Sequence, residues 1–261
     1  MRKFIKRFYL VIILLFLYIP IIVMIAQSFN AGKSRAVWEG FSFRWYAELF
    51  ADSAIINALS VTLTIALLSA VISTILGTLA AIGIHAMKKR PQAMMMTITN
   101  IPMTMPDIVT GISLMLLFMF AKVGRGYWTM LLAHITFDTP YVILSVLPKL
   151  RQMNSHSYEA ALDLGATPRY GLTHVILPQI MPGVITGCLL AFTLSLDDFT
   201  VSYFTTSPLI QNLSTLIYSK ARIGIEPTLN ALSALMFAVL LLLLVVVNYR
   251  AAKVEKAQQG Q

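Results

Sequence analysis

The sequence predicts an all-α, polytopic membrane protein whose six transmembrane helices form a single domain over residues 1–261. Composition gives the first indication, because 57% of the residues are hydrophobic, only 12% are charged and the mean hydropathy is +0.76. Soluble domains usually carry about 25% charged residues. The second indication is a set of apolar runs that approach or exceed the roughly 20 residues needed to cross a bilayer as a helix. The alternating segments of about ten residues that build a transmembrane β-barrel are not seen.

Each expected span follows from one apolar run, and the six lie at residues 8–29, 56–86, 92–121, 127–149, 183–206 and 231–249. The first is too long for the apolar part of a signal peptide and lacks a small-x-small cleavage pattern, so we expect it to remain as a span. Within the third span, Pro106 is expected to start a new half-helix with Asp107 near its positive end. Within the fourth, Asp138 precedes Thr139-Pro140 and is interpreted as the cap of a helix break.

The distribution of positive charge predicts the orientation. The net charge of +9 comes from clusters at the ends of the spans, such as Arg2 to Arg7, Lys88 to Arg90 and Arg250 to Lys256. Clusters at membrane edges argue against nucleic acid as a partner. Thirteen Lys and Arg residues fall on one side of the expected membrane and seven on the other, so both termini are expected to be cytoplasmic. This orientation places the loop 150–182 in the cytosol.

The cytoplasmic loop has the local pattern of two short helices. Tyr158 to Leu164 is expected to be helical, with its carboxylates in the early turns where the helix dipole favours them. Gly165 suits the left-handed residue after a helix end. Thr167-Pro168 supplies a cap and a first proline for a second helix, which we expect to stop before Pro178. An amphipathic loop resting on the lipid surface is the alternative, but the first helix has few basic residues to meet lipid headgroups. The pattern favours a docking surface for a partner.

The same loop resembles the EAA loop of ABC-importer permeases. The likeness rests on Glu159-Ala160-Ala161, Gly165 and Ile176-Leu177-Pro178 at their fixed spacing. The chain is also similar from end to end to the second permease subunits of spermidine/putrescine importers. The segments that carry this wider likeness include Tyr18-Ile-Pro-Ile, Met105-Pro-Asp-Ile-Val109, His134-Ile-Thr-Phe137, Ser195-Leu-Asp-Asp198 and Pro227-Thr-Leu-Asn230-Ala231.

The resemblance implies a fold, a location and a set of partners. The fold would be the ABC-importer permease (MetI-like) core of five helices plus one N-terminal helix, in the bacterial cytoplasmic membrane. The partners would be a sister permease, a cytoplasmic ATPase dimer and an extracytoplasmic polyamine-binding protein. The residues implied in ATPase coupling are Glu159, Ala160, Ala161, Gly165, Ile176, Leu177 and Pro178. The chain has no G-x-x-x-x-G-K-[ST] phosphate loop, so we expect no catalysis and no cofactor here, and we assign the use of Mg-ATP to the partner ATPase.

Carboxylates within the expected spans mark a candidate pathway, since ionisable groups at membrane depth are costly and usually functional. Asp107 and Asp197 both lie roughly 21–23 Å from the cytoplasmic ends of their spans at about 1.5 Å per residue. On a continuous helix Asp198 would share a polar face with Ser195 and Ser202, which favours Asp198 over Asp197 as the direct ligand. Tyr203 can add an aromatic face for a cation.

Metal ligation is not expected, because the single Cys188 and the four His residues lack ligand spacing. Two alternatives to polyamine import stay open. One is an importer of the same architecture for a metal cation or an oxyanion, and unpaired carboxylates disfavour the oxyanion. The other is an ion-coupled secondary transporter, which would not need the docking loop. The preferred polyamine and the sister subunit's share of the site are also open.

Overall fold

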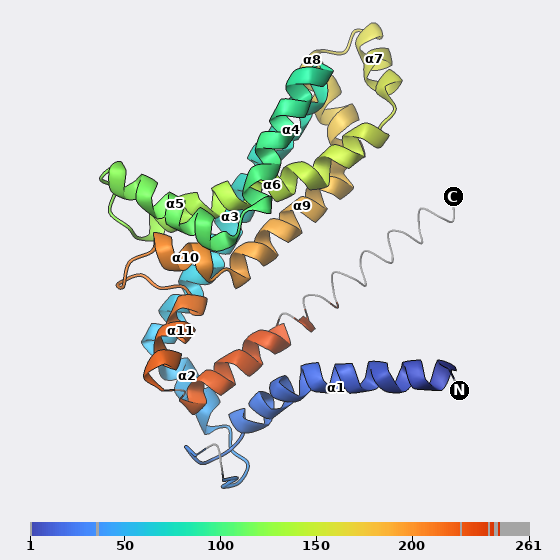
Figure 1. Ribbon diagram of the computed structural model, residues 1–261. Helices are drawn as coiled ribbons and strands as arrows, with labels where there is room; N and C mark the ends of the chain where they lie inside the picture. The colour runs from blue at the N-terminus through green and yellow to red at the C-terminus, as the bar shows by residue number, and fades with distance from the viewer. Residues whose placement is uncertain (1, 35–36, 225, 240, 243–244, 246–261) are drawn as a thin grey trace. The chain divides into compact units, whose positions relative to one another are not determined.

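The structure of the protein is a computed structural model that describes residues 2–34, 37–224, 226–239, 241–242 and 245 (Figure 1). The all-α prediction is confirmed, because the described residues form helices and only two isolated β-bridges, Asn30 with Phe41 and Ser207 with Ile210. The helices are α1 (Arg2–Ser28), α2 (Arg44–Ala51), α3 (Ser53–Ala86), α4 (Lys89–Thr104), α5 (Asp107–Phe120), α6 (Tyr127–Gln152), α7 (Ser155–Asp163), α8 (Pro168–Gly171), the π-helical turn η1 (Leu172–Ile176), α9 (Leu177–Asp197), α10 (Thr200–Thr205) and α11 (Leu213–Ile223). A further apolar helix covers Pro227–Val239.

Four helical stretches are long and apolar enough to cross a membrane: Arg7–Ser28, Ser53–Ala86, Tyr127–Gln152 and Pro168–Asp197. The helices α4 and α5 supply a fifth span if they are counted together, although they are bent by 103° at their junction. The helix Pro227–Val239 is shorter, and most of the rest of the expected span 231–249 lies outside the described residues, as does the basic cluster Arg250 to Lys256. The count of six spans and the cytoplasmic placement of both termini therefore stay predictions.

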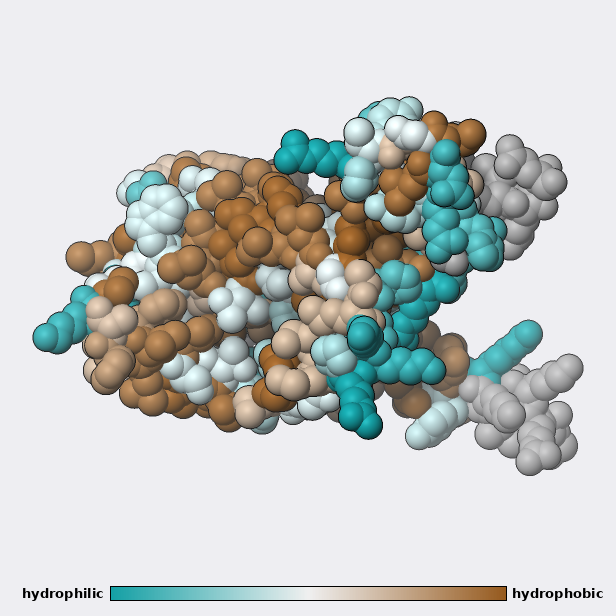
Figure 2. Space-filling view, turned by 90° about the horizontal axis from the view of Figure 1, so that it is seen from above, coloured by the Kyte–Doolittle hydropathy of each residue, from teal (hydrophilic) through white to brown (hydrophobic). Residues whose placement is uncertain are grey.

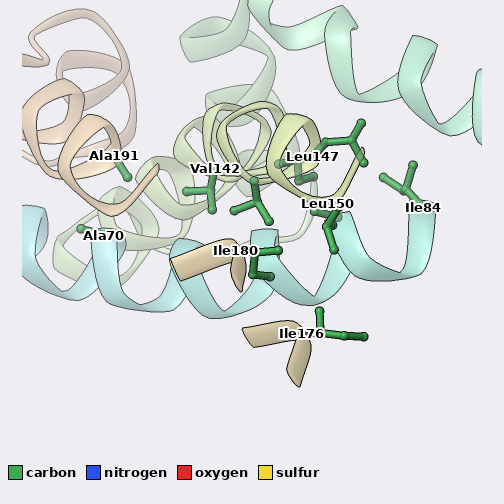
Figure 3. Packing of buried hydrophobic residues seen from close by; sticks show 11 residues of the cluster. Ala70, Ile84, Val142, Leu147, Leu150, Ile176, Ile180 and Ala191 are labelled. Carbon is green, nitrogen blue, oxygen red and sulfur yellow. The ribbon is translucent and has the colours of Figure 1, made fainter. Parts of the chain in front are cut away.

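The chain forms two compact units, one from Met1–Ile56 with Ile217–Gln261 and the other from Asn57–Leu216. The expected single domain stays a prediction. In the larger unit, α6 and α9 pack closely and share a buried core with α3, to which Ala70, Val142, Ile180 and Ala191 contribute (Figure 3). Glycines permit this approach: a Cβ on Gly187 would lie 3.1 Å from the Cα of Val142. Small residues at helix contacts are typical of membrane bundles.

The smaller unit is organised around Asn30. Its side-chain amide donates to the carbonyl of Val37 at 2.8 Å, and its backbone carbonyl accepts from the indole of Trp45 at 2.6 Å. An ion pair between Lys220 Nζ and Asp52, at 2.8 Å, ties α11 to the start of α3. The apolar window of α1 has no residue buried in the protein.

Much of the surface is apolar. Hydrophobic residues cover a large part of the face seen in Figure 2, whereas the most hydrophilic residues form smaller separate groups. Exposed side chains such as Leu67, Leu79 and Leu116 contribute to this character. A surface of this kind is suited to lipid and to other apolar helices.

Two expected helix boundaries in the spans are wrong. The segment 183–206 is not one helix, because α9 ends at Asp197 and α10 begins at Thr200. Conversely, α6 runs without a break through Asp138 and Pro140, so Asp138 is not a cap. The hydroxyl of Thr139 donates to the carbonyl of Ile135 at 2.6 Å, and most of the apolar window of α6 is buried by neighbouring helices. Such packing lets a transmembrane helix tolerate a proline.

The second helix of the loop 150–182 also continues beyond its expected end. It does not stop before Pro178, because the π-helical turn η1 leads directly into α9. The backbone N–H of Leu177 bonds to the carbonyl of Leu172, five residues earlier. Widening the helix by one residue in this way accommodates a proline that cannot donate a backbone hydrogen bond.

Candidate functional site

An aspartate lies at or just before the start of two short helices of the larger unit, Asp107 at α5 and Asp198 before α10. The break between α4 and α5 lies where Pro106 indicates it, with Pro106 extended and Asp107 the first residue of α5. At the second break, the carboxylate of Asp198 accepts hydrogen bonds from the backbone N–H groups of Val201 (3.1 Å) and Ser202 (2.7 Å). Asp198 therefore caps α10, since a carboxylate at a helix N-terminus satisfies its unpaired donors and its dipole.

The helices α5 and α10 are in contact at Gly111. A Cβ on Gly111 would lie 2.9 Å from the ring of Phe204 and 3.3 Å from the carbonyl oxygen of Thr200, so only glycine allows this approach. Asp107 precedes Gly111 by one helical turn, and Asp197 precedes Thr200 by three residues. The contact thus brings the candidate pathway residues of two breaks into one region.

The exposure of the adjacent aspartates differs from the sequence interpretation. The side chain of Asp198 is 7% exposed, whereas Asp197 is exposed, as is Asp107. Among the described residues, the carboxylates of Asp107 and Asp197 have no hydrogen bond or ion pair. Because α9 ends at Asp197, Asp198 and Ser202 do not lie on one continuous helix, and the shared polar face that favours Asp198 as the direct ligand does not form. Tyr203 is 44% exposed on α10, with its ring centroid 5.4 Å from those of Phe199 and Phe204.

A buried polar network fixes the break between α9 and α10. The ring of His134 on α6 bonds through Nδ1 to Ser195 Oγ (2.6 Å) and through Nε2 to Ser202 Oγ (2.8 Å), one on each side of the break. Its Nε2 also lies 3.5 Å from the carboxylate of Asp198. From the other side, Asn212 Nδ2 donates to Ser202 Oγ at 2.8 Å and to the carbonyl of Asp198 at 3.2 Å. Both half-helices are therefore tied to the same histidine.

Sequence reasoning missed the hydrogen-bonding role of His134. A signal was present: one histidine in an apolar span, and a polar stripe of Ser195, Asp198 and Ser202 in another. Within the described part of the chain, no three His, Cys, Asp or Glu side chains gather as a metal site. The network therefore acts here as a set of hydrogen bonds between helices.

The helix α7 begins earlier than expected. Asn154 Oδ1 accepts from the N–H of His156 at 3.1 Å and caps the helix at Ser155. Glu159 consequently lies in the middle of α7 and Asp163 at its end, so the expected placement of carboxylates in the early turns is wrong. The cap at Asn154, and not the position of the carboxylates, determines where this helix begins.

The connection between α7 and α8 follows its local pattern. Gly165 has φ +87, and its N–H bonds to the carbonyl of Leu162 at 2.9 Å while Ala166 N–H bonds to Ala161 at 3.0 Å. These two bonds form a Schellman motif, which requires a left-handed residue. Thr167 Oγ1 then accepts from the N–H of Tyr170 at 3.3 Å, with Pro168 as the first helical residue. Both expectations are confirmed.

The coupling residues expected from the sequence divide into an exposed and a buried group. Glu159, Ala160, Gly165 and Pro178 are exposed, as is Leu164 at the tip, which is 89% exposed. Ala161 is half-buried.

Ile176 is buried in the core cluster beside Ile180, and Leu177 packs against that cluster, so both have a packing role. Sequence reasoning missed Gly171, where a Cβ would lie 2.7 Å from the ring of Tyr158. This contact sets how closely α8 approaches α7.

Comparison with known proteins places these features in context. Residues 73–256 match the family described as binding-protein-dependent transport system inner membrane component. The putrescine transport system permease protein PotI of Escherichia coli (strain K12) is 40% identical, with 92% of this chain and 88% of the relative covered. The spermidine/putrescine transport system permease protein PotC is 38% identical in Haemophilus influenzae (94% and 95% covered) and 35% identical in Escherichia coli (strain K12) (94% and 93% covered).

Solved structures share the fold. A bacterial ABC transporter involved in the import of the acidic polysaccharide alginate has a chain with a TM-score of 0.69 and 20% identity, covering 94% of this chain and 95% of that chain. The alginate transporter in complex with its pentasaccharide-bound periplasmic protein gives a TM-score of 0.68 at 20% identity, covering 94% of each chain. At this level of identity the likeness concerns the fold alone.

Proposed function

Because this chain belongs to the family of inner membrane components of binding-protein-dependent transport systems, we propose that it is the permease subunit of an ATP-driven importer of spermidine or putrescine. The observation that carries the substrate class is the 35–40% identity to spermidine and putrescine permeases over nearly the whole chain. A polyamine is a flexible polycation. It needs carboxylates for its ammonium groups and aromatic faces beside its methylene stem.

The pathway residues follow from exposure and packing. Asp107 and Asp197 offer exposed carboxylates beside the contact of α5 with α10, and Tyr203 offers a half-exposed ring. Asp198 contributes indirectly, by capping α10 and holding the break at which Asp197 lies. We therefore assign the direct contact to Asp197 and a positioning role to Asp198.

The energy for transport comes from a partner in this proposal. Glu159, Ala160 and Gly165 face outward on α7 and its end, where they form an exposed docking surface for a cytoplasmic ATPase dimer. The continuous helix from Pro168 to Asp197 joins that surface to the α9–α10 break. A sister permease would complete the pathway, and an extracytoplasmic binding protein would deliver the polyamine. The exposed apolar surfaces are consistent with such a partner and with lipid.

The test is reconstitution of the full complex in proteoliposomes, with labelled putrescine and spermidine as cargo. We expect the amine-loaded binding protein to stimulate both ATP hydrolysis and uptake. Asp107→Asn and Asp197→Asn should lower uptake at limiting amine while the complex still assembles. Thr193→Val is the matched control, because that exposed hydroxyl one turn from Asp197 bonds only within its own helix. Stimulation by a metal cation or an oxyanion, and not by either amine, would overturn the proposal.

A further inference from the structure

Asp138 is a fully buried carboxyl group in the middle of α6. Its exposure is 0%, and neither carboxylate oxygen has a hydrogen-bond partner among the described residues. The hydroxyl of Ser69 lies beside it. The single proton of that hydroxyl, however, points to Ser195 Oγ at 3.0 Å or to the carbonyl of Ala66 at 3.3 Å.

The surroundings of Asp138 leave it unsatisfied in either protonation state. An ionised carboxylate without a partner is very unfavourable in an apolar interior. The charged group that acts on it in the described structure is the carboxylate of Asp198, which has the same sign. A protonated carboxyl could donate to the oxygen of Ser69, but its second oxygen would still lack a donor, and a buried polar atom without a partner is costly as well. The described residues therefore leave this carboxyl group only partly satisfied in either protonation state.

The groups around Asp138 suit an ammonium ion. His134 lies one helical turn earlier on α6 and holds Ser195, which in turn accepts from Ser69. Two carboxyl groups and two hydroxyl oxygens thus gather where α3, α6 and the α9–α10 break meet. An ammonium group has three donors and no acceptor, and this set supplies acceptors of both kinds.

We propose that Asp138 is an inner ammonium-binding position of the transport pathway, occluded in this conformation and reached when the α9–α10 break moves away from α6. This inference rests on the proposed function. The exposed carboxylates of Asp107 and Asp197 receive the cation first, and Asp138 receives it after the helices separate. The polar network around His134 closes the site again once the cation has left.

The experiment compares variants of the reconstituted complex in putrescine uptake. Asp138→Asn keeps the size and removes the charge, so we expect the maximal uptake rate to fall at least tenfold, with normal assembly and normal basal ATP hydrolysis. Asp138→Glu should recover part of the rate. Thr136→Val, a matched control on the same helix, removes an exposed hydroxyl that bonds only to Leu132 and should behave as wild type. If Asp138→Asn assembles and imports putrescine at the wild-type rate, the inference is wrong.

Failure of the Asn variant to assemble is addressed by two further measurements. Asp138→Ala buries no polar group, so an assembled but inactive Ala variant supports the site, whereas an assembled and active one overturns it. In the wild-type complex without amine, an apolar carbodiimide should modify Asp138 during basal ATP hydrolysis, and added putrescine should lower the yield of that carbodiimide adduct in a peptide-resolved mass spectrum. Absence of modification, or modification that putrescine does not change, refutes the site. Putrescine uptake by the wild-type complex tests the proposed function separately. If the wild-type complex imports no putrescine, the proposed function is wrong, whatever the variants do.

Discussion

Replacing the two adjacent aspartates one at a time should separate stability from transport. Asp198 caps α10 with two backbone hydrogen bonds and lies beside His134, whereas Asp197 is exposed. We expect Asp198→Ala to destabilise the permease and Asp197→Asn to leave its stability unchanged. Transport should show the opposite order for the conservative variants, with Asp197→Asn more impaired than Asp198→Asn.

The magnitude follows from the contacts. Loss of a helix N-cap costs about 0.5–2 kcal/mol, and hydrogen bonds to a charged group are worth about 1.5–3 kcal/mol, so we expect about 2–3 kcal/mol for Asp198→Ala. Asp198→Asn keeps one acceptor oxygen and should cost about 1 kcal/mol. Asp197→Asn removes an exposed charge, and surface substitutions usually change the free energy of unfolding by at most about 0.5 kcal/mol.

The assay is unfolding of the purified permease by titration with a denaturing detergent, followed by helical circular dichroism, alongside uptake by the reconstituted complex. The shift in unfolding midpoint of Asp198→Ala is compared with that of Asp197→Asn. This comparison does not depend on the absolute stability of the permease. If Asp198→Ala unfolds at the same detergent fraction as wild type, the capping argument is refuted. The assignment of Asp197 to the pathway is refuted if Asp197→Asn destabilises the protein more than Asp198→Asn does.

Three further predictions concern the loop 150–182 and the smaller unit. Gly165→Val places a β-branched residue at φ +87, so ATP hydrolysis should lose its coupling to uptake, while Gly165→Asn should be milder; equal coupling in all three proteins would contradict this. Gly171→Ala should reduce coupling because its Cβ meets Tyr158 at 2.7 Å, and Tyr158→Leu in the same chain should restore it; failure of that rescue would refute the contact. The hydrogen bond from Lys220 lowers the pKa of the Asp52 carboxyl below its usual value, so the stability that the ion pair contributes is fully present above the ordinary pKa of an aspartate and is lost as pH falls through the lowered one. The unfolding midpoint of Lys220→Met should therefore change less than that of wild type between pH 7 and pH 3, and parallel curves would disprove the role of the pair.

Local signals predicted the parts of the fold that depend on neighbouring residues. Gly165 and Thr167-Pro168 act within a few residues of themselves, and both take the conformations that their chemistry favours. Pro106 likewise marks the bend between α4 and α5. Pro140 and Pro178 are prolines too, but neither interrupts its helix. The helix α6 is packed on several sides, and a π-helical turn accommodates Pro178.

Features that depend on distant residues could not be predicted in this way. The break after Asp197 has no proline or glycine to announce it, and it is stabilised by His134, which lies 61 residues from Ser195 and 68 from Ser202 in the chain. The burial of Asp138 is likewise a property of the helices that surround it. Periodicity indicates which face of a helix is polar, but it does not indicate which other helix that face will meet.

The π-helical turn at Leu172–Ile176 has a mechanical consequence. Because the helix is not interrupted there, Pro168–Asp197 forms a single lever of 30 residues, about 45 Å long at 1.5 Å per residue. A tilt of about 5° about a pivot near Pro168 would carry the end at Asp197 sideways by about 4 Å. That displacement is longer than any hydrogen bond in the network around His134. A small rotation at the Pro168 end, where we expect the partner ATPase to dock, is thus enough to separate the α9–α10 break from α6, because one uninterrupted helix connects the two places.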